Sequence, residues 1–292
     1  MYYNIIGKKK IFLTISGVLC GLSLLALIFW GLKPGIDFTG GTMMEIKFKE
    51  KTLTNQEIKD NLKEFNLGEI NIQLAENGKT VLRFKEVNEE IHQRILGKLS
   101  RPEESLFETI GPTIGKELTN KAKWAIVLVN LAILVYVAWA FRKLSKIIKK
   151  GESWLYGGGA IVAMVHDVLV MLGLFAVLGH FKGIEINSTF ITAVLTVIGY
   201  SVNDTIVVYD RMRENFLIYG WKDFSGIVNR SLNETLTRSL NTTFTTLLAL
   251  LAIFFFGGAT IRDFVLAMMV GIATGAWSSI AIATPFLFLK KR

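Results

Sequence analysis

IGYSVNDTIVVYDR, residues 198–211, places Asn203 and Asp204 inside an apolar segment rather than at its edge. The surrounding run, residues 186–209, is long enough to cross a bilayer, which takes about 20 helical residues. Asp204 precedes Asp210, where the polar flank begins, by six residues, which places it roughly 9 Å into the apolar layer at about 1.5 Å per residue. A charge at that depth costs about 2.5–3.5 kcal/mol. The stretch therefore predicts either a functional carboxyl group that meets a partner or a proton, or a structural hydrogen-bond cluster between helices.

The composition is that of a membrane protein. Of 292 residues, 51% are hydrophobic, and the mean hydropathy of +0.42 is too high for a soluble domain of this size. We predict a polytopic α-helical membrane protein with six transmembrane helices, at residues 11–30, 122–141, 157–179, 186–209, 240–256 and 264–289. The predicted regions are residues 1–31 with the N-terminus and first span, residues 32–121 with a polar insertion, and residues 122–292 with a five-helix bundle.

Lysine and arginine residues are unevenly distributed, which predicts the orientation. The formal net charge of +9 falls on the membrane half, mainly at residues 8–10, 142–150, 211–238 and 290–292, which share one side if the spans alternate. Because basic residues near span ends stay in the cytoplasm, we expect cytoplasmic termini and an extracytoplasmic insertion. The charge thus indicates topology and contact with anionic lipids, and no nucleic-acid partner. Residues 211–238 are also amphipathic, which fits a helix in the membrane interface or a plain connector.

The insertion has the pattern of one small α+β domain. Alternation in residues 44–48 predicts a strand, and a capping box of Thr54 and Glu57 predicts the helix that follows. Two strands around a hairpin turn at residues 77–78, a second helix and a last strand complete the order βαββαβ. That order predicts a ferredoxin-like extracytoplasmic domain between the first and second transmembrane helices. The Gly-dense connector before it, residues 34–42, is predicted to serve close packing rather than phosphate binding.

Two further charged residues lie in or beside the apolar layer. Asp167, beside His166, falls near the midpoint of the third span, where it serves either ion movement or a structural hydrogen bond. Arg238 enters the fifth span from the same side as Asp204. The pattern fits equally a charge-assisted pair of Arg238 with Asp204 and simple anchoring of Arg238 in the cytoplasm. The candidate proton- or ion-coupling residues are therefore Asp204, Arg238, Asn203 and Asp167.

Hydroxyl groups crowd the start of the fifth span. Thr242, Thr243, Thr245 and Thr246 would either line a hydrated path, together with Tyr200, or bond back to carbonyl groups of their own helix. Both alternatives stay open at this point, because a threonine in a span satisfies its hydroxyl group in either way.

Small residues recur at four-residue steps in the sixth span, with Gly271 and Gly275 at its centre. Such a stripe lets two helix backbones approach closely. Gly17 and Gly21 of the first span are its predicted counterpart.

Five blocks, in order along the chain, resemble the signature blocks of the SecD/SecF family of bacterial protein-export proteins, and of its SecF branch in particular. The blocks are residues 35–42, His166-Asp167, 198–215, 229–238 and 271–285. The resemblance implies a half-transporter of the RND superfamily that pairs with SecD in the bacterial cytoplasmic membrane. It implies action with the SecYEG channel and the SecA motor on a translocating preprotein, with YajC and YidC as further partners. It also implies use of a proton or sodium gradient, with Asp204 and Arg238 in the coupling.

Two other functions fit the pattern less well. A half-sized RND-type efflux or lipid transporter would share the six spans, but such pumps need a roomy substrate path and usually duplicate the six-span unit. An intramembrane hydrolase would need a base after Ser201, yet the three histidines, at positions 92, 166 and 180, all precede it. A His-Glu-x-x-His motif does not occur either. We therefore expect no catalytic site, no metal and no cofactor.

Overall fold

The computed structural model describes residues 2–48, 53–74, 78–140, 153–220 and 222–288. The basic runs at residues 142–150 and 290–292 and the first residue of the predicted hairpin turn lie outside the described residues. The chain divides into two compact units. The helical bundle comprises Met1–Leu32, Ala125–Ile184 and Thr189–Arg292, and the sheet domain comprises Lys33–Trp124 and Glu185–Ser188.

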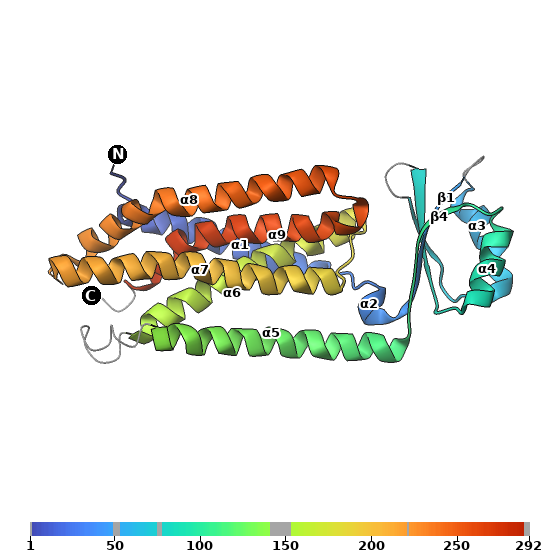
Figure 1. Cartoon of the computed structure of the whole chain (residues 1–292), viewed down its shortest axis with the longest axis horizontal. Coiled ribbons are helices and arrows are strands. Elements are labelled where there is room, and N and C mark those ends of the chain that lie inside the picture. Colours follow the sequence, from blue (N-terminus) through green and yellow to red (C-terminus); the bar gives the residue numbers. More distant parts are fainter. Residues whose placement is uncertain (1, 49–52, 75–77, 141–152, 221, 289–292) are drawn as a thin grey trace. The chain divides into compact units, whose positions relative to one another are not determined.

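Six helices of the described part are long and apolar enough to cross a membrane, as the hydropathy pattern predicts. A short 3-10 turn, η1 (Ile6–Lys8), precedes the first of them. The six, labelled in Figure 1, are α1 (Lys9–Phe29), α5 (Pro112–Ala140), α6 (Ser153–Lys182), α7 (Ser188–Tyr219), α8 (Phe224–Phe256) and α9 (Ala259–Ser278).

Helices α7 and α8 are longer than the sequence pattern predicts. They have 32 and 33 residues, or about 50 Å each at about 1.5 Å per residue, which exceeds the roughly 30 Å apolar layer. The segment predicted as an interfacial helix or connector, residues 211–238, is therefore divided between the end of α7 and the start of α8. Asp223 caps α8, since its carboxylate accepts the backbone N–H of Gly226 at 2.8 Å.

The last helix changes its winding near its end. After α9 the chain forms a π-helical turn, η5 (Ser279–Ala283), and a short helix, α10 (Thr284–Phe286). Pro285 lacks a backbone N–H and its ring crowds the carbonyl one turn earlier, which explains why regular α-helical bonding fails here. The hydroxyl of Thr284 donates to the carbonyl of Ser279 at 2.9 Å across this wider turn.

The sheet domain has the predicted order of strands and helices, β1-α3-β2-β3-α4-β4. Its four strands pair antiparallel in the order β2-β3-β1-β4. Both helices pack on one face of the sheet, and the predicted Thr54–Glu57 capping box is present at the start of α3 (Figure 1). The bounds are α2 (Ile36–Thr39), β1 (Gly41–Lys47), α3 (Asn55–Leu62), η2 (Lys63–Phe65), β2 (Asn71–Leu74), β3 (Lys79–Phe84), α4 (Glu89–Lys98) and β4 (Glu103–Ile110).

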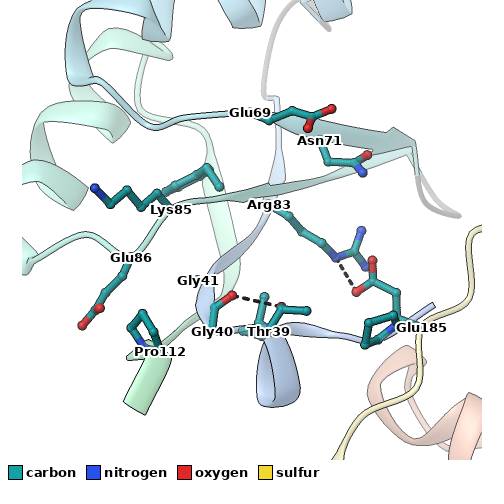
Figure 2. A pocket seen from close by; sticks show the side chains of 13 residues that line it. Thr39, Gly40, Gly41, Glu69, Asn71, Arg83, Lys85, Glu86, Pro112 and Glu185 are labelled. Atoms are coloured by element: carbon teal, nitrogen blue, oxygen red, sulfur yellow. Dashed lines mark hydrogen bonds and ion pairs between the residues drawn. The ribbon is translucent and has the colours of Figure 1, made fainter. Parts of the chain in front are cut away.

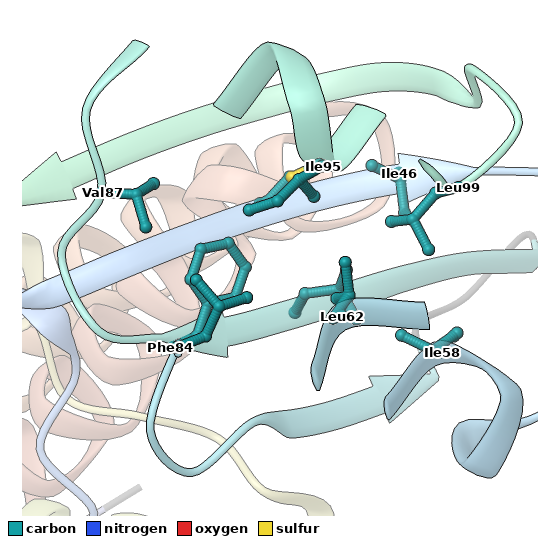
Figure 3. Packing of buried hydrophobic residues seen from close by; sticks show 10 residues of the cluster. Ile46, Ile58, Leu62, Phe84, Val87, Ile95 and Leu99 are labelled. Atoms are coloured by element: carbon teal, nitrogen blue, oxygen red, sulfur yellow. The ribbon is translucent and has the colours of Figure 1, made fainter. Parts of the chain in front are cut away.

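The core of the sheet domain lies between the sheet and its two helices, as Figure 3 shows. Alternate residues of β1 and β3 point into it, which is the burial that strand periodicity predicts. The labelled core residues are Ile46, Ile58, Leu62, Phe84, Val87, Ile95 and Leu99.

Candidate functional site

Asp167 of α6 is fully buried at the centre of the helical bundle. Its Oδ2 accepts hydrogen bonds from the hydroxyls of Ser201 on α7, at 2.6 Å, and Ser278 on α9, at 2.7 Å. Its Oδ1 lies 3.0 Å from Nδ1 of His166. One carboxylate thus ties three helices together, and its hydrogen bonds offset the cost of burying it.

Gly275 of α9 lets α7 approach Asp167. A Cβ atom at this position would lie 3.2 Å from the Cα of Ser201 and 3.6 Å from Asp167 Oδ2. One turn earlier, a Cβ at Gly271 would overlap the side chain of Val197 on α7. The small residues of α9 therefore form a packing face, and its partner helix is α7.

The predicted counterpart of this face, Gly17 and Gly21 on α1, does not meet it. No heavy atom of the described chain outside the helix itself lies within 4 Å of a Cβ built at either glycine. Helix α1 instead packs on α6, where a Cβ at Gly173 would overlap Ser23. The close approach of α1 therefore depends on a glycine in the other helix, which the pattern within α1 does not reveal.

Asp204 lies one turn beyond Ser201 on α7 and is only 4% exposed. Ser239 of α8 faces its carboxyl group, and Asp167 is near enough to act on it electrostatically. In the described part of the chain, Asp204 Oδ2, Ser239 Oγ, Thr243 Oγ1 and His166 Nε2 are buried polar atoms without a hydrogen-bond partner. Because nearly all buried polar groups in proteins are paired, the unpaired oxygen of Asp204 marks a group that can accept a proton.

Arg238 does not pair with Asp204. It is exposed, and it lines a cavity of about 440 Å³ with Asp210, Arg211 and Glu234 among the other lining residues. Successive residues on a helix point about 100° apart, so Ser239 facing Asp204 turns Arg238 away from it. Arg238 is thus an exposed charged group on the flank of the bundle, and its anchoring in the cytoplasm stays a prediction.

Asn203 is also separated from the site. Its side chain is exposed, whereas the neighbouring Asp204 is buried, because the two residues point in different directions from α7. Asn203 and Asp204 are adjacent in the sequence but therefore lie on different faces of α7.

The threonines of α8 divide into two kinds. The hydroxyls of Thr242, Thr245 and Thr246 donate to carbonyls of the preceding turn at 3.1, 2.9 and 2.8 Å. Thr246 also lies 3.3 Å from the hydroxyl of Tyr200. Thr243 alone of the four is buried, one turn from Ser239, and its hydroxyl has no hydrogen-bond partner in the described structure.

The polar block at residues 229–238 fastens helices instead of lining the site. Glu234 accepts hydrogen bonds from Arg211 at 2.7 Å and Asn215 at 2.7 Å, both on α7, and from Arg230 at 2.8 Å. These contacts join the start of α8 to the end of α7, where the two helices extend beyond the predicted spans.

Asn229 holds the N-terminal segment against α8. Its Oδ1 accepts the backbone N–H groups of Ile5 and Ile6 at 2.8 and 3.1 Å, and its Nδ2 donates to the carbonyl of Tyr3 at 3.0 Å. Asn233 adds a second bond from its Nδ2 to the same carbonyl, at 2.9 Å. The segment before α1 is therefore bound through its backbone.

The sequence pattern does not indicate that Ser278 and Ser239 contact the buried carboxyl groups, or that Ser201 donates a hydrogen bond to Asp167. A serine inside an apolar span usually bonds back to its own helix, so its presence alone carries little signal. The spacing from Ser201 to Asp204 does indicate that Ser201 shares a helix face with Asp204, because residues three apart lie on the same face.

Two family models match the chain. The model described as protein export membrane protein SecD/SecF, C-terminal, matches residues 92–292, and the SecD/SecF GG motif matches residues 26–52. Relatives described as protein translocase subunit SecF occur in several bacteria. A protein translocase subunit SecF from Thermobaculum terrenum is 42% identical over 277 residues, covering 89% of this chain and 85% of that protein. Another, from Anaerolinea thermophila, is 36% identical over 293 residues, covering 98% and 93%.

Solved structures with a similar fold exist. The crystal structure of SecDF, a translocon-associated membrane protein from Thermus thermophilus, matches with a TM-score of 0.82 and 32% identity over 98% of this chain. SecDF in its super-membrane-facing form matches with a TM-score of 0.69 and 31% identity over the same share. This chain spans 38% of the length of each SecDF chain.

Proposed function

The chain belongs to the SecD/SecF family of protein-export membrane proteins, and on this premise we propose that it couples a transmembrane ion gradient to protein export across the bacterial cytoplasmic membrane. It is a multi-pass membrane protein and a non-enzymatic translocase subunit of the SecF kind. The relatives support protein export over efflux or lipid transport, because those described above are protein translocase subunits.

The observation that carries the proposal is Asp204 itself, a buried carboxyl group with an unpaired oxygen. A proton that reaches Asp204 removes a charge that the apolar layer makes costly and ends its repulsion with Asp167. Asp167 keeps its three polar contacts throughout and serves as the fixed centre of the bundle. Protonation then changes the contact between Asp204 on α7 and Ser239 on α8, and release of the proton on the other side restores it. A bound sodium ion would neutralise the carboxylate of Asp204 in the same way.

The orientation forms part of the proposal. We place both termini in the cytoplasm and the sheet domain outside. This placement is supported by the basic flanks of the spans and by the proximity of the two ends of the chain, since Lys9 Nζ lies 4.2 Å from the ring centre of Phe288. The strand order β2-β3-β1-β4 with two helices on one face supports a ferredoxin-like assignment for the sheet domain.

SecD is the proposed partner within the membrane. The match to SecDF chains supports it, and so does the exposed polar surface that Asn203, Arg238 and Thr242 present. Polar groups that face lipid are costly, and a second helical protein would cover them. The further proposed partners are the SecYEG channel, the SecA motor, YajC, YidC, the translocating preprotein and anionic lipids.

The proposal is tested with Asp204→Asn in export vesicles that carry the partner proteins. Asn has nearly the same size and cannot exchange a proton, so gradient-dependent stimulation of export should disappear while the protein still inserts. Asp210→Asn is the matched control, because Asp210 lies on the same helix outside the buried site and pairs with Arg213. Undiminished stimulation with Asp204→Asn would contradict the proposal.

A further inference from the structure

Residues Glu185–Ser188 connect α6 to α7, and they belong to the compact unit of the sheet domain. Ile186 forms a parallel bridge with Pro34. The N–H of Gly35 donates to the carbonyl of Ile186 at 2.7 Å, and the N–H of Ile186 donates to the carbonyl of Lys33 at 2.8 Å. The connector before α7 is thus paired backbone to backbone with the segment that precedes α2.

Side chains hold the same connector to the sheet. The carboxylate of Glu185 lies 2.8 Å from Nε of Arg83 on β3 (Figure 2). It also lies 3.4 Å from Nζ of Lys33. The Arg83 and Glu185 side chains are only 17% and 11% exposed, so solvent screens this pair less than a surface pair. At the next turn, Asp37 Oδ2 accepts the N–H of Ser188, the first residue of α7, at 2.6 Å. A carboxylate at a helix N-terminus is also favoured by the helix dipole.

Glycines make this close arrangement possible. A Cβ at Gly35 would lie 3.1 Å from the carbonyl oxygen of Ile186. Gly41 has a φ of +123°, and a Cβ there would lie 2.8 Å from the carbonyl oxygen of Phe84 at the end of β3. The Gly-dense connector predicted to serve packing therefore brings Asp37 and Gly35 to the chain before α7, and β1 to the strand that carries Arg83.

A cavity of about 560 Å³ lies beside this pair, but its charged lining residues give no evidence for a bound ligand. Arg83 and Glu185 both line it, and the two charges already satisfy each other (Figure 2). Its other acidic lining residues include Glu86, which is exposed and offers a matched control.

Helix α7 starts at this anchored connector and carries both Ser201 and Asp204. A helix transmits displacement along its axis because its backbone hydrogen bonds resist stretching. We propose that Arg83, Glu185 and Asp37 form a permanent mechanical link through which a displacement of α7, caused by a change of charge at Asp204, is delivered to β3 of the sheet domain. This inference rests on the proposed function. It adds the positioning residues that transmit the displacement of α7 to the sheet domain.

The test uses the full chain with its partner proteins in sealed vesicles, and it records gradient-driven proton uptake and gradient-stimulated export in the same sample. Arg83→Glu and Glu185→Arg should each lower the stimulation of export by at least about fivefold, a coupling of ordinary size, while proton uptake stays at the wild-type level. The charge-swapped double variant should regain at least half of the lost stimulation, and Glu86→Gln should behave like the wild type. Asp37→Asn keeps an acceptor oxygen for Ser188 and should lose less stimulation than Arg83→Glu.

Several results would overturn the link. Wild-type stimulation in both single variants would show that the pair transmits nothing. Simultaneous loss of proton uptake and stimulation would place the pair in the ion site itself, and a swap that folds but restores nothing would show that pairing is not what matters. Chromatographic and thermal-unfolding profiles of each purified variant identify misfolding. If the charge-reversal variants misfold, Asp37→Asn and Glu185→Gln replace them. A loss of stimulation with wild-type proton uptake in these variants supports the link, and wild-type stimulation in both contradicts it. Failure of the proposed function is recognised separately, because Asp204→Asn would then leave both readouts unchanged.

Discussion

Ser201 and Asp204 lie three residues apart on α7, and both are buried, but their polar contacts differ: the hydroxyl of Ser201 donates a 2.6 Å hydrogen bond to Asp167 Oδ2. Asp204 keeps an oxygen without a partner. One face of α7 therefore carries a fixed polar contact and a free carboxyl oxygen one turn apart. This contrast separates residues that hold the bundle together from Asp204, the residue for which we propose ion binding.

Ser278→Ala should destabilise the protein by about 1.5–3 kcal/mol, because it removes a buried hydrogen bond to a charged group. Ser279→Ala is the matched control, since Ser279 is equally buried but its hydroxyl donates, in the described structure, only to the carbonyl of Ala276 in the preceding turn. We expect the control to lose less stability than Ser278→Ala, because a hydrogen bond between neutral groups contributes only about 0.5–1.5 kcal/mol. Denaturant unfolding in detergent measures both, and equal losses would contradict the role assigned to Asp167.

Gly275→Val should destabilise by about 1–3 kcal/mol, because even its Cβ would lie 3.2 Å from Ser201 and the branched side chain needs more room. Gly17→Ala and Gly21→Ala should be neutral or stabilising by up to about 1 kcal/mol, since open space surrounds both positions and alanine favours a helix. Thermal unfolding in the same detergent compares the three. A larger loss at Gly17 or Gly21 than at Gly275 would show that the glycines of α1 serve close helix packing after all.

The spans and the order of the sheet domain were predictable because they depend on local periodicity and length. The pairing of helices was not. Arg238 was a reasonable partner for Asp204 by depth, but the partner is set by the rotation of α8, and a shift of one residue brought Ser239 to face Asp204. The start of α8 was also not predictable. Residues 224–238 are polar enough to be taken for a connector, although they form the first turns of this helix.

The same reasoning explains the glycines and serines. A glycine stripe indicates that some helix packs closely against it, but the identity of that helix depends on the three-dimensional arrangement. Gly271 and Gly275 meet α7, and it is Gly173 of α6 that admits α1. Ser278 became significant only when the structure placed it 2.7 Å from Asp167, on another helix and far away in the sequence.

Arg238→Gln should leave the free energy of unfolding within about 0.5 kcal/mol of the wild type, because Arg238 is exposed and forms no ion pair with Asp204. Equilibrium unfolding of the detergent-solubilised chain measures this. A loss of more than about 3 kcal/mol, the size expected when one partner of a buried ion pair is removed, would restore the pair that the sequence allowed.

Asn229→Ala should release the N-terminal segment, since it leaves the N–H groups of Ile5 and Ile6 without their acceptor at a cost of about 1–3 kcal/mol. Hydrogen exchange of these two amides should accelerate by at least about tenfold. Asn229→Asp keeps the accepting oxygens and should preserve most of the protection. Unchanged exchange in the alanine variant would show that other contacts hold the segment.

In the proposed function, the carboxyl group of Asp204 gains and loses a proton within the bundle. Infrared difference spectroscopy of the protein in sealed vesicles tests it directly, because a protonated carboxyl group has a carbonyl stretch that the carboxylate lacks. We predict a band that appears when the medium on the sheet-domain side is acidified and that is missing in Asp204→Asn. A carboxylate at Asp204 that stays ionised whatever gradient is imposed would contradict the account.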